Sequence, residues 1–103
     1  MTLSDIHFHD SVLFRVIEDA EKHTLSLEVD YPVDWDNEVY ERKHIVFTDV
    51  LDYQVHEGPF AGPPTLLEWS TAPHASGRVL VRLETDAGFR QFAFRDVSLS
   101  DAT

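Results

Sequence analysis

The sequence predicts a mainly β fold: a single-domain antiparallel β-sandwich or open barrel of about seven strands over residues 1–103, with little or no helix. Apolar and polar side chains alternate along most of the chain, which is the period of a strand with one buried face. Turn residues separate the apolar segments at intervals of roughly 8 to 12 residues, as in sandwiches and barrels. No window of about ten residues has the period of an amphipathic helix.

The clearest strand spans residues 24–31, where Leu25, Leu27, Val29 and Tyr31 alternate with polar side chains. The segment before it has apolar residues of both parities, so part of that strand is expected to be covered on both faces. The short polar stretch between the two suits a hairpin connection. The predicted strands are residues 12–17, 24–31, 43–48, 50–56, 65–70, 78–84 and 89–95.

Two breaks interrupt the later strands. A kink or bulge near Asp49 is expected to separate the third strand from the fourth. Residues 58–64 form a loop, because three of the seven are prolines without an amide hydrogen and two are glycines.

The last hairpin has a predicted register. Its loop, residues 85–88, is of even length, which places Val81 opposite Phe92 and Val79 opposite Phe94. These four apolar side chains would then share one face of the sheet.

The negative charge is concentrated in the first 57 residues, which carry 14 Asp and Glu but only four Lys and Arg. The formal net charge of −11 therefore divides into −10 there and −1 in the remainder. Such a surface disfavours nucleic acid and anionic membranes, because each phosphate contact needs a cation. It favours a basic protein partner, which long-range attraction would steer toward it.

The sequence also lacks the residues and segments that several other kinds of protein and site require. The absence of cysteine excludes disulfides, thiolate metal sites and a cysteine nucleophile. The first residues lack the basic and apolar regions of a signal peptide, and no apolar run approaches the ~18 residues of a membrane-spanning helix. We therefore expect a cytoplasmic protein.

An acidic and aromatic stretch, residues 30–41, is the predicted partner-binding site. Aromatic side chains supply contact area, and carboxylates supply charge-assisted hydrogen bonds to arginine. The alternative is a solvated loop with one aromatic side chain in the core. The predicted binding residues are Tyr31, Asp34, Trp35, Asp36, Glu38, Tyr40 and Glu41.

The pair His7 and His9, followed by Asp10, has the spacing of metal ligands that project from one face of a strand. The remaining ligands of the cupin and amidohydrolase patterns are absent. We therefore expect no metal here, and expect Asp10 to be a turn residue whose carboxylate accepts backbone amides.

A calcium loop is also disfavoured. Asp34, Asp36 and Glu38 occupy the first, third and fifth positions of an EF-hand loop. However, Val39 stands where that loop needs glycine, and Ile45 stands where it needs a bidentate glutamate. No cofactor is expected.

No catalytic motif is found. The chain lacks the Gly-x-Ser-x-Gly motif, and no Ser or Thr stands at a recognised spacing from a His and an acid. The four glycines form no phosphate-binding loop. The expectation is that the protein is not an enzyme.

Several segments resemble small uncharacterised bacterial β-domains, some families of which are placed with the immunity proteins of polymorphic toxin systems. They are residues 8–11 (FHDS) with the alternating strand 12–16, residues 24–29 (TLSLEV), residues 45–50 (IVFTDV) and residues 94–97 (FRDV). The resemblance implies a compact β fold that binds and silences a toxin.

The sequence thus favours a non-enzymatic acidic interaction protein, an immunity-type inhibitor of a basic partner. One alternative is a small-ligand-binding barrel, with an arginine holding an anionic group. Its cavity would be lined by Trp69, Phe92, Phe94 and Tyr53. Another alternative is a structural homo-oligomer, such as a homodimer, that pairs exposed strand edges.

Overall fold

The protein forms two antiparallel β-sheets, as seen in a computed structural model that describes residues 3–6, 10–34, 36–59 and 62–101. A 3₁₀ helix and eight strands follow one another along the chain: η1 (Leu3–Asp5), β1 (Leu13–Asp19), β2 (Thr24–Asp34), β3 (Val39–Thr48), β4 (Leu51–Glu57), β5 (Leu66–Pro73), β6 (Val79–Thr85), β7 (Gly88–Phe94) and β8 (Asp96–Asp101). The mainly β prediction is confirmed. Within the described part of the chain, no helix has the length and apolar character needed to cross a membrane.

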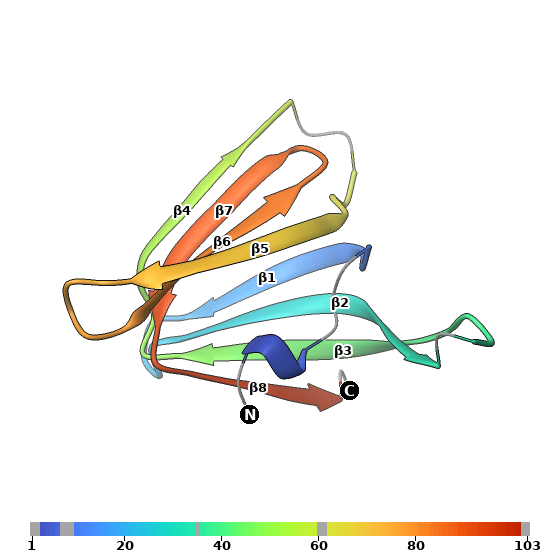
Figure 1. Ribbon diagram of the computed structural model, residues 1–103, viewed down its shortest axis with the longest axis horizontal. Helices are drawn as coiled ribbons and strands as arrows, with labels where there is room; N and C mark the ends of the chain where they lie inside the picture. Colours follow the sequence, from blue (N-terminus) through green and yellow to red (C-terminus); the bar gives the residue numbers. More distant parts are fainter. Residues whose placement is uncertain (1–2, 7–9, 35, 60–61, 102–103) are drawn as a thin grey trace.

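Each sheet has four strands (Figure 1). The first sheet has the order β1-β2-β3-β8, and the second has the order β4-β7-β6-β5. The chain changes sheet at the β3–β4 and β7–β8 connections, which lie at the same end of the molecule. There the Arg95 amide donates to the Thr48 carbonyl oxygen at 3.0 Å. Asp49, with a φ of +51°, provides the predicted kink between the third and fourth strands.

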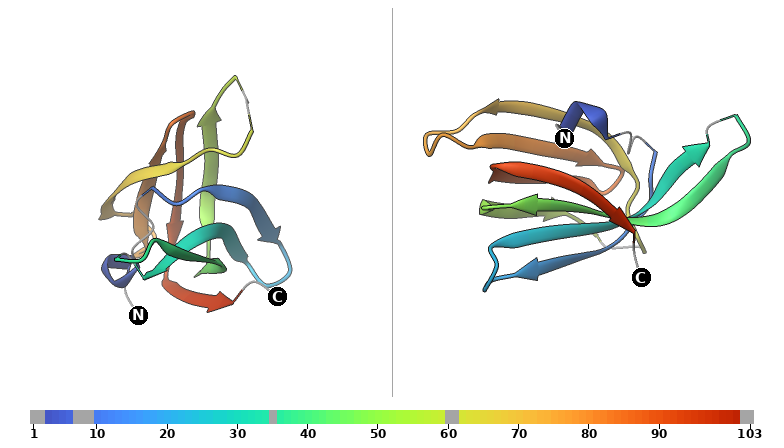
Figure 2. Two further views of the ribbon diagram at one scale, coloured as in Figure 1. Left: turned by 90° about the vertical axis from the view of Figure 1, so that its right-hand side faces the viewer. Right: turned by 90° about the horizontal axis from the view of Figure 1, so that it is seen from below.

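The two sheets are also hydrogen-bonded to each other where β1 and β5 begin. Val12 and Thr65 form an antiparallel bridge. The Leu13 amide donates to the Pro64 carbonyl oxygen, and the Leu66 amide donates to the Ser11 carbonyl oxygen, both at 2.8 Å. The fold is therefore a sandwich closed along the side where β1 and β5 meet, with β8 and β4 as the edge strands of the other side (Figures 1 and 2).

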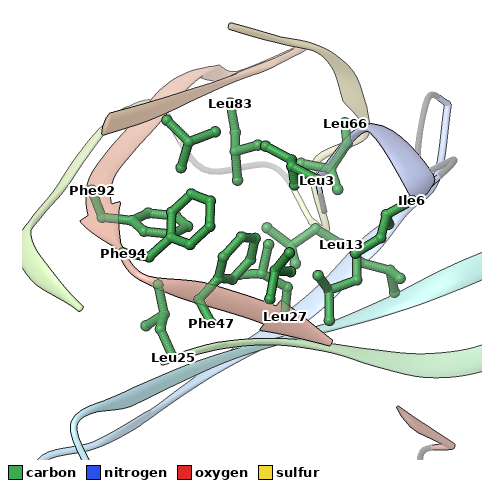
Figure 3. Close-up of a cluster of buried hydrophobic side chains, with 14 of the residues drawn as sticks. Leu3, Ile6, Leu13, Leu25, Leu27, Phe47, Leu66, Leu83, Phe92 and Phe94 are labelled. Atoms are coloured by element: carbon green, nitrogen blue, oxygen red, sulfur yellow. The ribbon is translucent and has the colours of Figure 1, made fainter. Parts of the chain in front are cut away.

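The core fills the space between the sheets (Figure 3). Phe47 of the first sheet packs edge-on against Phe92 and Phe94 of the second, with ring centroids 4.7 and 4.9 Å apart. Aliphatic side chains of alternating strand positions surround these rings. From η1 and the residue after it, Leu3 and Ile6 are buried in the same cluster.

The predicted register of the last hairpin is confirmed. Val81 lies opposite Phe92, and Val79 lies opposite Phe94. Val81, Phe92 and Phe94 are buried, whereas Val79 is exposed at the end of its strand.

Two features differ from the prediction. The β2 and β3 strands continue well beyond residues 31 and 43, so most of the acidic stretch is a hairpin rather than a loop. The strand β8 was not predicted, because Val97 and Leu99 are its only apolar residues. Its position depends on pairing with β3, for example Val97 opposite Phe47.

Candidate interaction surface

The acidic stretch, residues 30–41, forms a hairpin that we call the acidic arm. It consists of the end of β2, a turn and the start of β3, and it projects beyond the rest of the first sheet (Figures 1 and 2). Tyr31 pairs with Glu41 and Pro32 with Tyr40, so strand pairing continues into the projecting part. The arm therefore has a regular backbone close to its tip.

Asp34 organises the turn of the arm. Its Oδ1 accepts hydrogen bonds from the Asp36 and Asn37 amides at 3.1 and 3.3 Å, and its Oδ2 accepts one from Asn37 Nδ2 at 2.7 Å. The Asn37 side chain is the main reason why the pKa of Asp34 lies below its ordinary value, and the two backbone amides lower it further. Asp34 was predicted to bind a partner, but both oxygens of its carboxylate hold the turn.

Exposed apolar side chains accompany the acids of the arm. Val33, Val39 and Tyr40 are 43%, 44% and 42% exposed. Exposed large apolar residues close together on one element are typical of interaction sites. Three further acids of the arm are exposed: Asp36, Glu38 and Glu41.

Two other predicted binding residues differ from these. Tyr31 is only 8% exposed and belongs to the core, so the alternative of one aromatic side chain in the core describes this residue correctly. Trp35 lies outside the described residues. Of the predicted residues, Asp36, Glu38, Tyr40 and Glu41 are exposed on the arm, and Val33 and Val39 are exposed beside them.

A cluster of charges holds the base of the arm. Glu28, whose side chain is nearly buried, lies 3.0 Å from Arg15 Nε, 3.6 Å from Arg42 Nη1 and 3.2 Å from His44 Nε2. The Arg42 guanidinium also lies 3.6 Å from the centroid of the Phe14 ring. Arg42 thus connects three neighbouring strands where the arm leaves the sheet.

The neighbours of Glu28 keep its carboxylate ionised. Burial raises the pKa of Glu28, but the hydrogen bond with His44 and the charges of Arg15 and Arg42 outweigh it. The pKa of Glu28 therefore lies below its ordinary value, and the carboxylate stays available to both arginines at neutral pH.

A second ion pair lies on the inner side of the second sheet. Arg90 Nη2 and Nε donate to the two carboxylate oxygens of Glu57 at 2.7 and 2.9 Å, and Arg90 Nη1 donates to the Tyr53 hydroxyl at 3.1 Å. The side chains of Arg90 and Glu57 are only 13% and 6% exposed. Since its partners occupy this arginine, it is not free to hold an anionic ligand.

The aromatic residues proposed for a ligand cavity also have other contacts. Phe92 and Phe94 pack against Phe47, and Tyr53 packs edge-on against Phe92 at 6.0 Å. Trp69 is partly buried against the same core. These contacts place the four side chains in or against a packed core, which weakens the alternative of a ligand-binding barrel.

Sequence reasoning missed one constellation, formed by Asp52, His74 and Ser76. His74 Nδ1 lies 2.7 Å from Ser76 Oγ, and His74 Nε2 lies 3.1 Å from Asp52 Oδ2. These are the residue types of a hydrolytic triad. Asp52 lies 22 residues from His74 in the sequence, and no local sequence motif predicts their contact.

The surroundings favour a structural role for this constellation. An oxyanion needs backbone amides free to donate. In this turn the Ser76 amide donates to His74 Nδ1, the Gly77 amide donates to the His74 carbonyl oxygen, and the Arg78 amide donates to Ser76 Oγ. The three side chains thus attach the β5–β6 turn to β4.

The two groups of residues at which the sequence analysis considered and disfavoured a metal can be compared with the structure in part. Among the described residues, no group of three or more His, Asp or Glu side chains is placed to hold a metal ion. His7 and His9 lie outside the described residues. Asp10 has a φ of +64°, which fits a turn residue, and its amide donates to the Leu66 carbonyl oxygen at 2.7 Å.

Comparisons with known proteins add no relative. No protein-family model matches this chain, and no curated protein matches it. The resemblance to immunity-type β-domains therefore stays a prediction, and the functional argument rests on the residues described above.

Proposed function

We propose that this protein is a non-enzymatic interaction protein that binds a basic protein through its acidic arm and inhibits it, as immunity proteins do. One observation supports this proposal above the others. The arm combines exposed apolar side chains with five acids and contains no Lys or Arg over residues 30–41. Apolar anchors beside acidic side chains suit a partner surface of positive charge. Of these acids, Asp34 holds the turn and Glu41 also lies 3.5 Å from Lys43 Nζ, so Asp36 and Glu38 at the tip are the main charges offered to a partner.

The two kinds of side chain have different effects on binding. The carboxylates raise the association rate, because a basic partner is attracted over distances up to the Debye length of about 10 Å at 0.1 M salt. Val39 and Tyr40 lower the dissociation rate, because their burial against the partner excludes water.

The base of the arm makes it a ready-formed binding element. Strand pairing, the Asp34 turn and the contacts of Arg42 with Phe14 and Glu28 order the arm before a partner arrives. An ordered element loses less conformational entropy on binding than a flexible loop does.

Paired affinity captures would test the proposal. One bait carries D36N, E38Q and E41Q in the arm. The matched control carries E21Q, E68Q and D96N, which remove the same charge from three exposed acids outside the arm. A basic protein should be retained by the wild type and the control, lost from the arm variant, and released by salt.

Kinetics and inhibition would then complete the test. With the captured protein, the arm variant should associate more slowly and show a weaker salt dependence, while Y40A should dissociate faster. An excess of the wild type should abolish the activity of the captured protein. Equal binding by the arm variant and the control would refute the proposal.

A further inference from the structure

We propose that two copies of this protein associate through the open edge of β4, pairing antiparallel about a two-fold axis at Val55. This inference goes beyond the proposed function, since the arm takes no part in it. It rests on the directions of the β4 backbone groups, on the charges of the four sheet edges and on the compatibility of the β4 side chains with those of a second, antiparallel β4 strand.

The backbone directions follow from the contacts between β4 and β7. The Gly58 amide donates to the Ala87 carbonyl oxygen at 3.2 Å. The carbonyl oxygen of His56 also faces β7, since it would lie 2.0 Å from a Cβ atom built on Gly88. Because successive backbone groups of a strand alternate in direction, the amide and carbonyl groups of Val55 point to the other side. There β4 is the last strand of its sheet.

The middle of β4 carries no charged side chain, and its acids, Asp52 and Glu57, lie toward the ends of the strand. Residues 53–56, Tyr-Gln-Val-His, contain no Asp, Glu, Lys or Arg. Val55 is 48% exposed, more than any other large apolar residue of the described chain. Natural edge strands are usually protected by charges, prolines or bulges. In β4 the bulge lies before Gln54, so the part around Val55 is without such protection.

The other three edges are less suited to self-association. β1 and β5 are hydrogen-bonded to each other where they begin, β1 carries Arg15, Glu18 and Asp19, and β5 ends in Pro73. β8 has an aspartate at each end. Antiparallel pairing of two β8 strands in full register would place these aspartates opposite each other, which is destabilising.

The β4 sequence is complementary to itself in this register. Val55 faces Val55 of the second copy, and their outward amide and carbonyl groups form a hydrogen-bonded pair. Gln54 faces His56 of the second copy, so an amide meets an imidazole. Tyr53 faces Glu57 of the second copy. No pair over residues 53–57 brings like charges together.

The net charge gives the association a distinctive salt dependence. Each copy carries −11, so salt should strengthen the dimer by screening the repulsion between copies. Binding of a basic protein to the arm should instead weaken with salt. The two proposals therefore fail or succeed independently.

Sedimentation of the full chain at increasing concentration would test this inference, at low salt and at about 0.5 M salt. The wild type should approach twice 11.8 kDa, at lower concentration in high salt. V55P removes only an outward amide, and V55K adds a charge facing its own copy, so both should stay monomeric. V79K is the matched control, because Val79 is also an exposed valine of the second sheet but belongs to β6, which is not at the β4 edge, and it should dimerise like the wild type.

Circular dichroism would show that the variants are folded. If V55P unfolds, V55K and the concentration-dependent exchange protection of the Val55 amide decide the question. A wild type that stays monomeric at about 1 mM, a concentration at which even weak pairing would be seen, overturns the inference. A dimer that V55P and V55K both leave intact overturns it as well.

Discussion

Two hairpins extend toward opposite ends of the molecule, and they differ in how their tips are held (Figure 1). The β5–β6 turn is attached to the β3–β4 region, because His74 contacts Asp52 and Arg78 Nε donates to the Asp49 carbonyl oxygen at 2.7 Å. In the acidic arm, the hydrogen bonds of Asp34 remain within the arm's own turn.

This difference shows what polar turn residues can do. In both hairpins a side chain that accepts hydrogen bonds organises the turn. The β5–β6 turn also contacts a distant strand, whereas the hydrogen bonds of Asp34 stay within the arm. Polar groups used within the body contribute to stability, whereas the acids at the tip of the arm leave their charge at the surface. The β5–β6 hairpin is thus fixed to the body of the protein, whereas Asp36 and Glu38 near the tip of the arm are exposed to solvent.

The largest effect is expected in the core on which both hairpins depend. F94A should lower the free energy of unfolding by about 3–5 kcal/mol, because Phe94 packs against Phe47 of the strand that enters the arm. Urea denaturation would measure this. A loss below about 1 kcal/mol would mean that the sheets are held together elsewhere.

The attachment of the β5–β6 turn should contribute less. H74A should cost about 1 kcal/mol, since it removes the contact with Asp52, which is exposed and screened by solvent. The matched variant H56A removes an exposed histidine of the same sheet that stacks on Phe89. If thermal unfolding shows no difference between H74A and the wild type, the turn is not anchored by His74.

Acid should loosen the tip of the arm. Because the pKa of Asp34 is lower in the folded protein than the ordinary 3.8, the stability it contributes is fully present above that value. It is lost as the pH falls through the lower, folded pKa. The Asn37 amide resonance should therefore shift in that acidic range in NMR spectra. D34A should show the shifted position already at neutral pH, and a wild-type resonance that does not respond would contradict the assigned role.

The smallest effect on stability is expected at the exposed acids of the arm. D36N with E38Q should change the free energy of unfolding by less than about 0.5 kcal/mol, because such surface substitutions are nearly neutral. The same variant should bind a basic partner more slowly. A large loss of stability in urea would show that these acids hold the arm together and are not free for a partner.

Local patterns in the sequence were sufficient for the fold class and for several elements. The alternation over residues 24–31 identified the strand that crosses the core, and the even loop at residues 85–88 gave the correct pairing of Val81 with Phe92. The position of the acidic stretch and its lack of positive charge were also evident. All of these depend on residues close together in the chain, where spacing alone determines which side chains share a face.

Only the tertiary structure decided how the distant parts meet. In the folded protein Tyr31 is buried and the Asp34 carboxylate accepts the hydrogen bonds of a turn. Arg90 forms an ion pair with Glu57 of the neighbouring strand, and His74 contacts Asp52. The tertiary structure also added β8, whose two apolar residues are too few to identify a strand without its neighbour β3. These outcomes depend on contacts between residues far apart in the sequence, and the same local pattern is compatible with many such contacts until the two sheets pack.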